Sequence, residues 1–200
     1  MPPSSATPPP VDAPAWAWQR RRPDLTPQAQ AQAWLASQLV GEGGPITLQR
    51  DARGRPRLCT PRACHDCNWS HSGEGLLVAL GEHLAVGVDM EWLRPRPRAL
   101  AVAARYFNPG EHDWLAAQAT ADARDHAFLR LWCAKEAVLK AHGHGLSFGL
   151  HRLRFEDTAA GLALSECDPA LGHPGDWRLR ELVPAPGYVG ALAWRPRATG

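Results

Sequence analysis

The stretch LRLWCAKEAVLKAHGHGL, at residues 129–146, combines a helical period with an unusual set of charged side chains. In a helix, Trp132, Glu136 and Lys140 are four residues apart and share one face, while Lys135 lies on the neighbouring stripe. Glu136 and Lys140 have the favourable orientation of an i,i+4 ion pair, which explains them on an exposed helix at a few tenths of a kcal/mol. A site for a metal-bound diphosphate needs the same groups. Both interpretations stay open on this stretch alone.

Further helices and strands are expected on both sides of this stretch. The long helix is predicted roughly over residues 121–142, with its C-cap at Gly143 and Gly145. Two shorter helices are expected ahead of it, in RALAVAARYF at residues 98–107 and in EHDWLAAQ at residues 111–118. Strands are expected after it at residues 150–155, 162–166, 177–183 and 188–194.

The N-terminal half also alternates helix and strand. Residues 1–14 are mainly Pro, Ala, Ser and Thr and are expected to form a flexible tail. QAQAQAWLASQL, at residues 28–39, follows a Thr-Pro pair in N-cap and first-turn positions and predicts a helix. ITLQRDARGRPRL, at residues 46–58, predicts two short strands around a turn, followed by a cysteine-containing loop. Residues 76–92 predict a hairpin of apolar strands.

The composition fits a folded α+β protein with two lobes. At 200 residues and 44% hydrophobic, the chain is long enough for one generous domain or two small packed lobes. Because helix and strand runs occur twice in turn, we expect an N-terminal α+β lobe at residues 15–95. The C-terminal α+β lobe, at residues 96–196, then carries the Lys-Glu-Ala helix.

Charge and hydropathy exclude several classes of protein. The net charge is +2, from 22 Lys and Arg against 20 Asp and Glu, which is not the footprint of bulk nucleic-acid binding. No apolar run approaches the roughly 18 residues of a membrane span, and the start of the chain lacks the pattern of a secretion signal. The five cysteines are odd in number and irregularly spaced, which suits reduced thiols. We therefore expect a cytoplasmic protein that binds neither nucleic acid nor membrane.

The stretch AVGVDMEW predicts two carboxylates on one face of a strand. Alternation places Gly87, Asp89 and Glu91 on one face, with apolar side chains on the other. Neighbouring carboxylates repel each other, so a cation between them, with a ligand approaching the bare backbone of the glycine, explains the pattern. Oxygen donors of this kind suit Mg²⁺. An edge strand with a solvated acidic face is the simpler alternative.

Two further polar groups have a structural and a functional interpretation each. Glu111 stands at the third helical position after Asn108-Pro109-Gly110, where Glu caps its own helix, and it is also a candidate general base. Ser70 and His71 fit an ordinary polar turn, or an anion contact made by a hydroxyl and an imidazole.

A cysteine-rich stretch raises the alternative of a structural zinc site. Cys59, Cys64, Cys67 and His71 have spacings that zinc can use. No second Cys-x-x-Cys pair is present, so a loop with buried or idle thiols is favoured over a metal site. A small zinc-stabilised nucleic-acid-binding domain would rest on the same residues.

Four motifs, taken in order, resemble one enzyme family. They are NWSHS at residues 68–72, VGVDMEW at residues 86–92, RYFNPGEHDWL at residues 105–115 and LWCAKEAVLKAHGHGL at residues 131–146. Together they resemble the 4'-phosphopantetheinyl transferases, in particular the longer surfactin-type class. The last motif matches the family pattern of Trp, Lys-Glu-Ala, Lys and Gly-x-Gly-Leu at every fixed position.

The resemblance implies a fold and a reaction. The reaction moves the phosphopantetheine arm of coenzyme A to a serine of an apo acyl or peptidyl carrier protein, with Mg²⁺, and releases adenosine 3',5'-bisphosphate. The implied fold has two similar α+β lobes related by a pseudo-twofold, with coenzyme A and Mg²⁺ in the cleft between them. Two lobes in one chain supply a complete cleft, so a monomer is expected.

The resemblance also assigns roles to the charged residues of the last motifs. Asp89, Glu91 and Glu136 would hold Mg²⁺ against the diphosphate. Lys140, together with Lys135, would neutralise phosphate oxygens.

Other residues receive roles by the same resemblance. Ser70 and His71 would contact the nucleotide end and its 3'-phosphate, and Glu111 would be the base that accepts the serine proton. Arg55 stands where the family's Gly-Lys-Pro motif has Lys, which keeps the charge but changes the hydrogen-bond geometry.

One departure from the family pattern supports an alternative function. The family has basic residues in and before its first helix to bind the 3'-phosphate, whereas residues 28–39 carry Gln and Ala. The arginines at residues 20–22 are candidates to compensate. The alternative is therefore a catalytically weak homologue that binds coenzyme A or a carrier protein.

Overall fold

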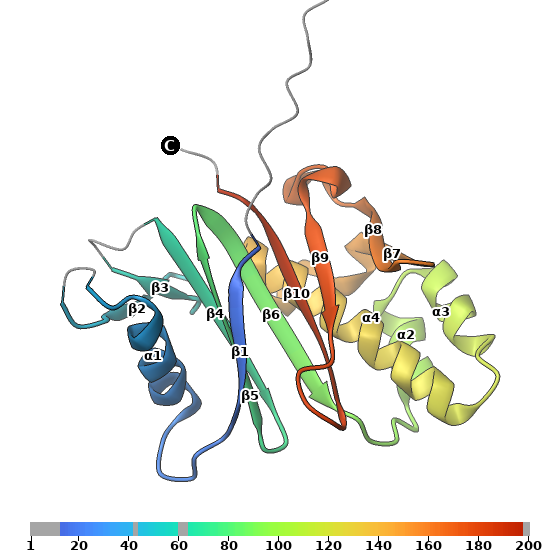
Figure 1. The fold of residues 1–200 in the computed structure, drawn as a ribbon. Helices are drawn as coiled ribbons and strands as arrows, with labels where there is room; N and C mark the ends of the chain where they lie inside the picture. The colour runs from blue at the N-terminus through green and yellow to red at the C-terminus, as the bar shows by residue number, and fades with distance from the viewer. Residues whose placement is uncertain (1–12, 42–43, 60–63, 198–200) are drawn as a thin grey trace, which may run out of the picture.

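The computed structural model describes residues 13–41, 44–59 and 64–197 and shows a mixed α+β fold (Figure 1). Its strands are β1 (Ala15–Arg20), β2 (Leu48–Arg50), β3 (Pro56–Leu58), β4 (His65–Ser72), β5 (Gly75–Glu82), β6 (Leu84–Trp92), β7 (Leu153–Thr158), β8 (Gly161–Cys167), β9 (Arg178–Leu182) and β10 (Tyr188–Pro196). Its α-helices are α1 (Pro27–Gln38), α2 (Ala99–Tyr106), α3 (Pro109–Ala116) and α4 (Ala121–His142). Short 3-10 turns occupy Leu146–Phe148, Leu150–Arg152, Pro169–Leu171 and Pro174–Asp176.

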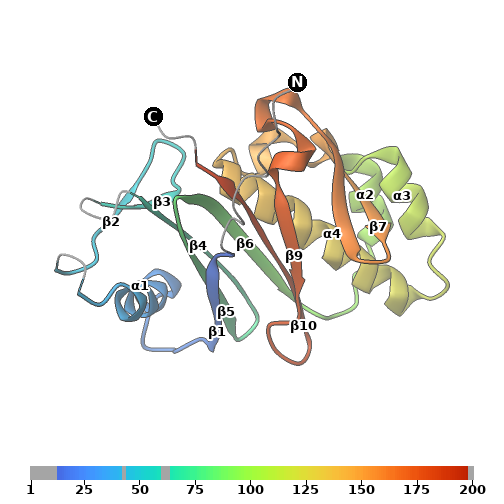
Figure 2. The ribbon, with the colours of Figure 1, turned by 45° about the horizontal axis from the view of Figure 1, so that its top comes forward.

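Two antiparallel three-stranded sheets form the centre of the molecule. The first has the strand order β1-β5-β4 and the second has the order β6-β10-β9. Two small hairpins, β2-β3 and β7-β8, complete the strands. Helix α1 covers the first sheet, and the long helix α4 lies against the second, as two views of the ribbon show (Figures 1 and 2).

Three clusters of buried apolar side chains follow this layering. One lies between α1 and the first sheet and includes Leu35 and Val78. A second joins the two sheets, for example through Leu77 and Val88, and the third lies between α4 and the second sheet. The alternation along β5 explains how one strand serves two clusters, since Val78 faces α1 while Leu77 faces the second sheet.

The helices agree with expectation because their termini carry strong signals. Thr26 accepts a hydrogen bond from the Ala29 amide at the start of α1. Asn108 and Glu111 form a reciprocal capping box at the start of α3. Helix α4 ends at Gly143, which has a φ of 91°. The expected N-terminal tail falls mainly on residues 1–12, outside the described residues.

The hairpin expected over residues 76–92 is wrong, although both of its strands exist. Strand β5 pairs with β1 and β4, whereas β6 pairs with β10. A single residue, His83, joins β5 to β6, and its φ is 54°. A two-residue turn is the usual minimum for a tight hairpin, so this connection instead passes the chain from one sheet to the other.

Two strands were not expected from the sequence. Strand β1 follows the proline-rich start of the chain, and β4 lies in the stretch expected to be a loop and polar turn. Strand β6 pairs only with the second sheet, so the expected lobe boundary after residue 95 falls beyond the point where the chain changes sheets.

Candidate active site

Strands β4 and β6 run side by side in the same direction and are joined through side chains. Asp66 accepts a hydrogen bond of 2.8 Å from the Val86 amide at its Oδ2, and Asn68 accepts one of 3.0 Å from the Val88 amide at its Oδ1. These two amides of β6 thereby find acceptors in side chains of β4, without a backbone ladder between the two edge strands. We call this contact, between residues 66–72 and 86–92, the seam.

Further along the seam the same arrangement orients two carboxylates. Ser70 Oγ donates to Asp89 Oδ1 at 2.7 Å, and Ser72 Oγ donates to Glu91 Oε2 at 3.0 Å. The Trp92 amide donates in turn to Ser72 Oγ at 3.1 Å. The polar side chains of β4 therefore orient the two acidic side chains of β6.

Gly87 lets helix α4 approach these carboxylates. A Cβ at residue 87 would lie 2.1 Å from the Ala137 carbonyl oxygen and 2.4 Å from the Ala141 amide nitrogen. The sequence predicted that a ligand approaches this bare backbone, but the helix occupies that place. This close contact carries Glu136 and Lys140 to the acidic face of β6.

The surroundings favour the charged form of Lys140 and disfavour the charged form of Glu136. Lys140 Nζ lies 2.7 Å from Asp89 Oδ1 and 3.2 Å from the Val88 carbonyl oxygen. Burial favours a lower pKa for Lys140, but the attraction of Asp89 outweighs it and the pKa lies above its usual value. Burial raises the pKa of Glu136 to about 7, and repulsion by Asp89 and Glu91 acts in the same direction.

The three carboxylates are suited to a divalent cation. In the part of the chain that the structure describes, Asp89 Oδ2 is buried and has no hydrogen-bond partner. Arg96 donates to Glu91 Oε2 at 2.6 Å, so two cationic side chains, Arg96 and Lys140, face three acidic ones. The unpartnered oxygen and the oxygen-only donor set fit Mg²⁺. The carboxylates do not all lie within 4.8 Å of one another, so binding an ion would require side-chain rotation.

Lys135 and Glu111 form a buried pair away from the seam. Lys135 is 0% exposed, and its Nζ lies 2.8 Å from Glu111 Oε2 and 2.9 Å from the Leu150 carbonyl oxygen. The other oxygen of Glu111 accepts a hydrogen bond of 2.8 Å from the Phe155 amide. Burial lowers the pKa of Lys135 to about 8, against the opposing attraction of Glu111.

This geometry corrects two expected roles. Successive residues of a helix differ by about 100° in direction, so Lys135 points into the core while Glu136 reaches the seam. Lys135 does not face a phosphate site. Glu111 keeps its capping role, and with both oxygens engaged it does not serve as an open general base.

Arg55 is a structural link and not an open anion contact. Its guanidinium group is buried, forms an ion pair with Asp66 and donates to the Val86 carbonyl oxygen at 2.8 Å. It also donates to the carbonyls of Lys140 and Ala141, in the last turn of α4, where helix carbonyls lack partners of their own. Arg55 therefore ties the C-terminal end of α4 to the seam, which corrects its expected contact with coenzyme A.

The expected Ser70-His71 pair is divided between the two faces of β4. Ser70 is buried against Asp89, whereas His71 is exposed on the opposite face. His71 lines a cavity of about 550 Å³ at the N-terminus of α1, together with Arg50, Trp69 and Gln28. We call it the α1 cavity. Burial lowers the pKa of His71, and the positive charges of Arg21 and Lys140 act in the same direction.

A second cavity, of about 430 Å³, adjoins the seam at Glu91. Its wall includes Arg94 and Arg96 from the segment after β6, and Phe128 and Trp132 from α4. We call it the linker cavity. Sequence reasoning missed these arginines, although the run RPRPR at residues 94–98 was a visible signal.

Comparison with known proteins decides the family. A sequence profile described as the 4'-phosphopantetheinyl transferase superfamily matches residues 85–193, more than half of the chain. The chain belongs to this superfamily. The matched residues contain β6 and α4, and with them the three carboxylates and Lys140. Membership makes the protein a phosphopantetheinyl transferase, a class for which coenzyme A is a substrate.

Similar proteins carry the same description. The 4'-phosphopantetheinyl transferase HetI of Nostoc sp. strain PCC 7120 is 32% identical over 171 residues, which cover 82% of this chain and 68% of that protein. The putative 4'-phosphopantetheinyl transferase slr0495 of Synechocystis sp. strain PCC 6803 is 32% identical over 177 residues, covering 85% and 70%. The 4'-phosphopantetheinyl transferase psf-1 of Bacillus pumilus is 34% identical over 105 residues, covering 52% and 43%.

Two other expectations concern membranes and zinc. Among the described residues no helix has both the length and the hydropathy to cross a membrane. Cys67 is 0% exposed beneath α1, and burial raises the pKa of its thiol to about 12. Among the described residues, Cys67 does not converge with Cys64 and His71 on a possible ion position.

Proposed function

We propose that this transferase moves 4'-phosphopantetheine from coenzyme A to the serine hydroxyl of an apo carrier protein and releases adenosine 3',5'-bisphosphate. The observation that carries the proposal is the meeting of Asp89 and Glu91 on β6 with Glu136 on α4, beside Lys140. These elements are separated in sequence, and only the fold brings their charges together.

Asp89, Glu91 and Glu136 are the residues that would hold Mg²⁺. When bound, the ion supplies charge neutralisation to the diphosphate and makes its phosphorus more electrophilic. Lys140 neutralises a phosphate oxygen from the same side. The Ser70 hydroxyl keeps Asp89 oriented, which matters because phosphoryl transfer depends mainly on positioning and electrostatics.

The α1 cavity is proposed to receive the nucleotide end of coenzyme A and its 3'-phosphate. His71 and Arg50 line it, and the positive end of the α1 helix dipole lies at its edge. Arg50 now donates hydrogen bonds to Gln28 Oε1 at 2.7 Å and to the Gly54 carbonyl at 2.6 Å. Its guanidinium group supplies the charge that the Gln- and Ala-rich helix lacks.

The linker cavity is proposed to face the carrier protein. It borders Glu91, and therefore the place where the acceptor serine must arrive. Arg94 and Arg98 give its rim positive charge, which complements an acidic carrier surface.

We also propose that the fold consists of two similar halves. In each half a first strand is followed by helix, a small hairpin and two more strands, and the last strand lies in the middle of its sheet. This shared connectivity supports two halves, residues 15–82 and 84–196, related by a pseudo-twofold as in the surfactin-type class. A cytoplasmic monomer is proposed with it.

Transfer can be tested with a panel of apo carrier proteins. The protein is incubated with coenzyme A and MgCl₂, and intact-mass spectrometry detects addition of one phosphopantetheine group to the carrier. We expect modification of at least one carrier and its loss when EDTA replaces MgCl₂. Glu136→Gln tests the site and Glu166→Gln, on the exposed surface of β8, is the matched control.

Two results would contradict the proposal. Unmodified carriers across acyl, polyketide and peptidyl types would oppose transfer. If coenzyme A or a carrier still bound, the protein would instead be a binding homologue. Full activity of Glu136→Gln would contradict the proposal that Glu136 is a ligand of Mg²⁺.

A further inference from the structure

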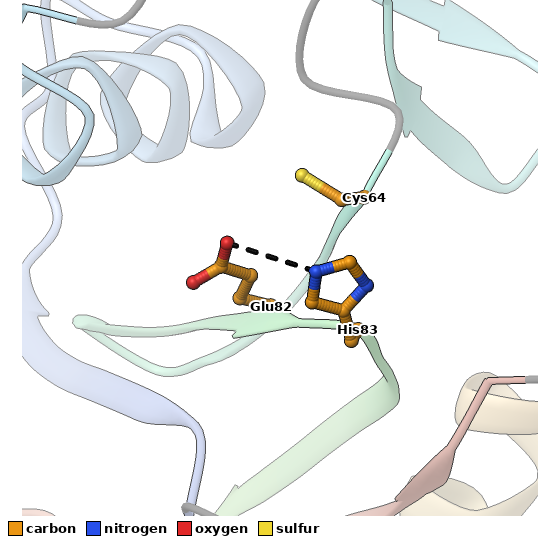
Figure 3. A group of neighbouring side chains, drawn as sticks. All are labelled: Cys64, Glu82 and His83. Atoms are coloured by element: carbon orange, nitrogen blue, oxygen red, sulfur yellow. Dashed lines mark ion pairs between the residues drawn. The ribbon is translucent and has the colours of Figure 1, made fainter.

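Three potential metal ligands of different chemistry converge at the junction of β4, β5 and β6. They are the thiol of Cys64, the carboxylate of Glu82 and the imidazole of His83, drawn in Figure 3. One ligand atom from each lies within 4.8 Å of the others. Cys64 directly precedes β4, Glu82 ends β5 and His83 is the single residue before β6, so two chain segments contribute.

The backbone holds these residues together before any ion arrives. The His83 amide donates a hydrogen bond of 2.8 Å to the Cys64 carbonyl oxygen, and Glu82 pairs with His65 in the β4-β5 ladder. The His83 carbonyl oxygen accepts a hydrogen bond of 2.9 Å from the Arg197 amide. Among the described residues His83 is the only non-glycine with a positive φ. The connection is therefore fixed on both sides in a conformation that non-glycine residues seldom adopt.

The side chains keep the freedom that metal binding requires. The side chains of Glu82 and His83 are 62% and 73% exposed, and Cys64 is half-buried. Glu82 Oε1 lies 3.9 Å from His83 Nε2, beyond hydrogen-bond distance. Cys64 Sγ lies 3.3 Å from His65 Nδ1, so an ion bound to the three side chains would replace this contact as well as the one between Glu82 and His83.

The donor set selects the class of ion. A thiolate sulfur, an imidazole nitrogen and a carboxylate oxygen suit Zn²⁺, whereas Mg²⁺ prefers oxygen donors alone. Tetrahedral bonds of about 2.0–2.3 Å place ligand atoms roughly 3.3–3.8 Å apart. Modest rotation of two exposed side chains suffices to close the observed separation. We propose that Cys64, Glu82 and His83 form a Zn²⁺ site, with a fourth position open to water.

This site differs from the zinc motif expected from sequence. That motif grouped Cys64 with Cys59, Cys67 and His71, but Cys67 is buried beneath α1 and His71 lines the α1 cavity. The proposed site keeps only Cys64 from the motif and takes its other ligands from the turn between the sheets.

The Zn²⁺ site is also distinct from the carboxylates of the seam. Asp89 follows His83 by six residues along β6, which corresponds to roughly 20 Å of strand. Zinc binding therefore neither requires nor tests the transferase proposal. Its structural effect would be to crosslink the start of β4 to the residue that connects β5 to β6.

Metal titration of the full chain tests the site. Metal-free protein is titrated with Zn²⁺ by calorimetry, and with Co²⁺ while the thiolate-to-cobalt charge-transfer absorption is followed. We expect one high-affinity Zn²⁺ per chain and a Co²⁺ spectrum with that thiolate band. Cys64→Ser should abolish the band and weaken Zn²⁺ binding by more than about tenfold.

Further variants separate ligation from folding. His83→Asn removes the imidazole while Asn tolerates positive φ, and Glu82→Gln removes the charge alone. Each should weaken Zn²⁺ binding with an unchanged circular dichroism spectrum. Cys167→Ser, which alters a half-buried thiol on β8, is the matched control and should bind as the parent does.

Three results would overturn the site. Absence of stoichiometric Zn²⁺ would do so directly. Zinc that binds equally well to Cys64→Ser would exclude Cys64 as a ligand. Cobalt that binds without a thiolate band, and whose binding is lost in Glu136→Gln, would place the ion at the seam carboxylates instead.

Discussion

Ser70 Oγ donates a hydrogen bond of 2.7 Å to Asp89 Oδ1, so a strand of one sheet orients the acidic side chain of the other. Lys140 Nζ reaches the same oxygen at 2.7 Å, which leaves Asp89 Oδ2 as the free acceptor. The proposed cation site thus depends on a hydroxyl that is not itself a proposed ligand.

Ser70→Ala should lower kcat by about tenfold, because a hydrogen bond to a charged group contributes about 1.5 kcal/mol to orienting it. The measurement is steady-state transfer at saturating coenzyme A. Ser165→Ala, which removes a hydroxyl bound to the Arg154 carbonyl, is the control and should retain the parental rate. An unchanged kcat in Ser70→Ala would show that Asp89 needs no such support.

Glu136→Gln should remove stabilisation by Mg²⁺ without weakening the metal-free fold. Burial and repulsion by Asp89 and Glu91 already oppose the charge of Glu136, so neutralising it relieves an unfavourable interaction. Thermal unfolding at pH 8, with and without MgCl₂, measures both effects. A large loss of metal-free stability would instead mean that Glu136 is a structural partner.

Lys135→Met should destabilise the fold by roughly 3 kcal/mol, because Met leaves the buried Glu111 carboxylate and the Leu150 carbonyl oxygen without the hydrogen bonds that the Lys135 amine donates in either protonation state. Denaturant unfolding measures the change. Lys140→Met is the matched comparison from the same helix, and it should cost less stability and more activity because its partner lies at the seam. The reverse ranking would exchange the roles proposed for the two lysines.

Stability should rise with pH between about 8 and 10.5. Burial lowers the pKa of Lys135 to about 8, below its ordinary value of 10.5, so in this window the unfolded chain binds more protons than the folded one. The penalty for burying the charge is complete below pH 8 and disappears above 10.5. Chemical denaturation across this range should show a positive slope that is absent in Lys135→Met.

Arg50→Gln should raise KM for coenzyme A and leave kcat for the bound substrate nearly unchanged. If Arg50 contacts the 3'-phosphate, the variant should also lose the parental preference for coenzyme A over its 3'-dephospho form. Arg53→Gln, on the exposed turn between β2 and β3, is the control. A preference that persists in Arg50→Gln would place the 3'-phosphate elsewhere.

Arg94→Glu should raise KM for the carrier protein and not for coenzyme A, because it reverses a charge on the rim of the linker cavity. The effect should shrink as salt is added, since screening weakens exposed charge pairs. Arg178→Glu, outside that cavity, is the control. An equal effect on both substrates would indicate a disturbed site rather than a docking surface.

The parts of the fold that sequence predicted are those specified by local signals. The Asn108-Glu111 capping box and the glycine at residue 143 fix helix ends within a few residues of the chain. Alternation along β6 correctly separated the apolar side chains from Asp89 and Glu91.

The parts that sequence missed depend on partners distant in the chain. Strand β4 lies where the sequence predicts a cysteine-containing loop and a polar turn. Its polar side chains Asp66, Asn68 and Ser70 each form a hydrogen bond with a residue of β6. The same limit applies to Lys135 and Arg55, whose charges suggested ligand binding. Their partners, Glu111 and Asp66, become visible only when the chain has folded.

Gly87 gives the site a fixed width. Because the backbone of α4 rests directly on this residue, the gap between the acidic face of β6 and Glu136 is defined by main-chain contact rather than by interchangeable side chains. A methyl group at residue 87 would overlap the backbone of α4 and force helix and strand apart. The distance between Glu136 and the carboxylates of β6 therefore depends on the absence of a side chain at this residue.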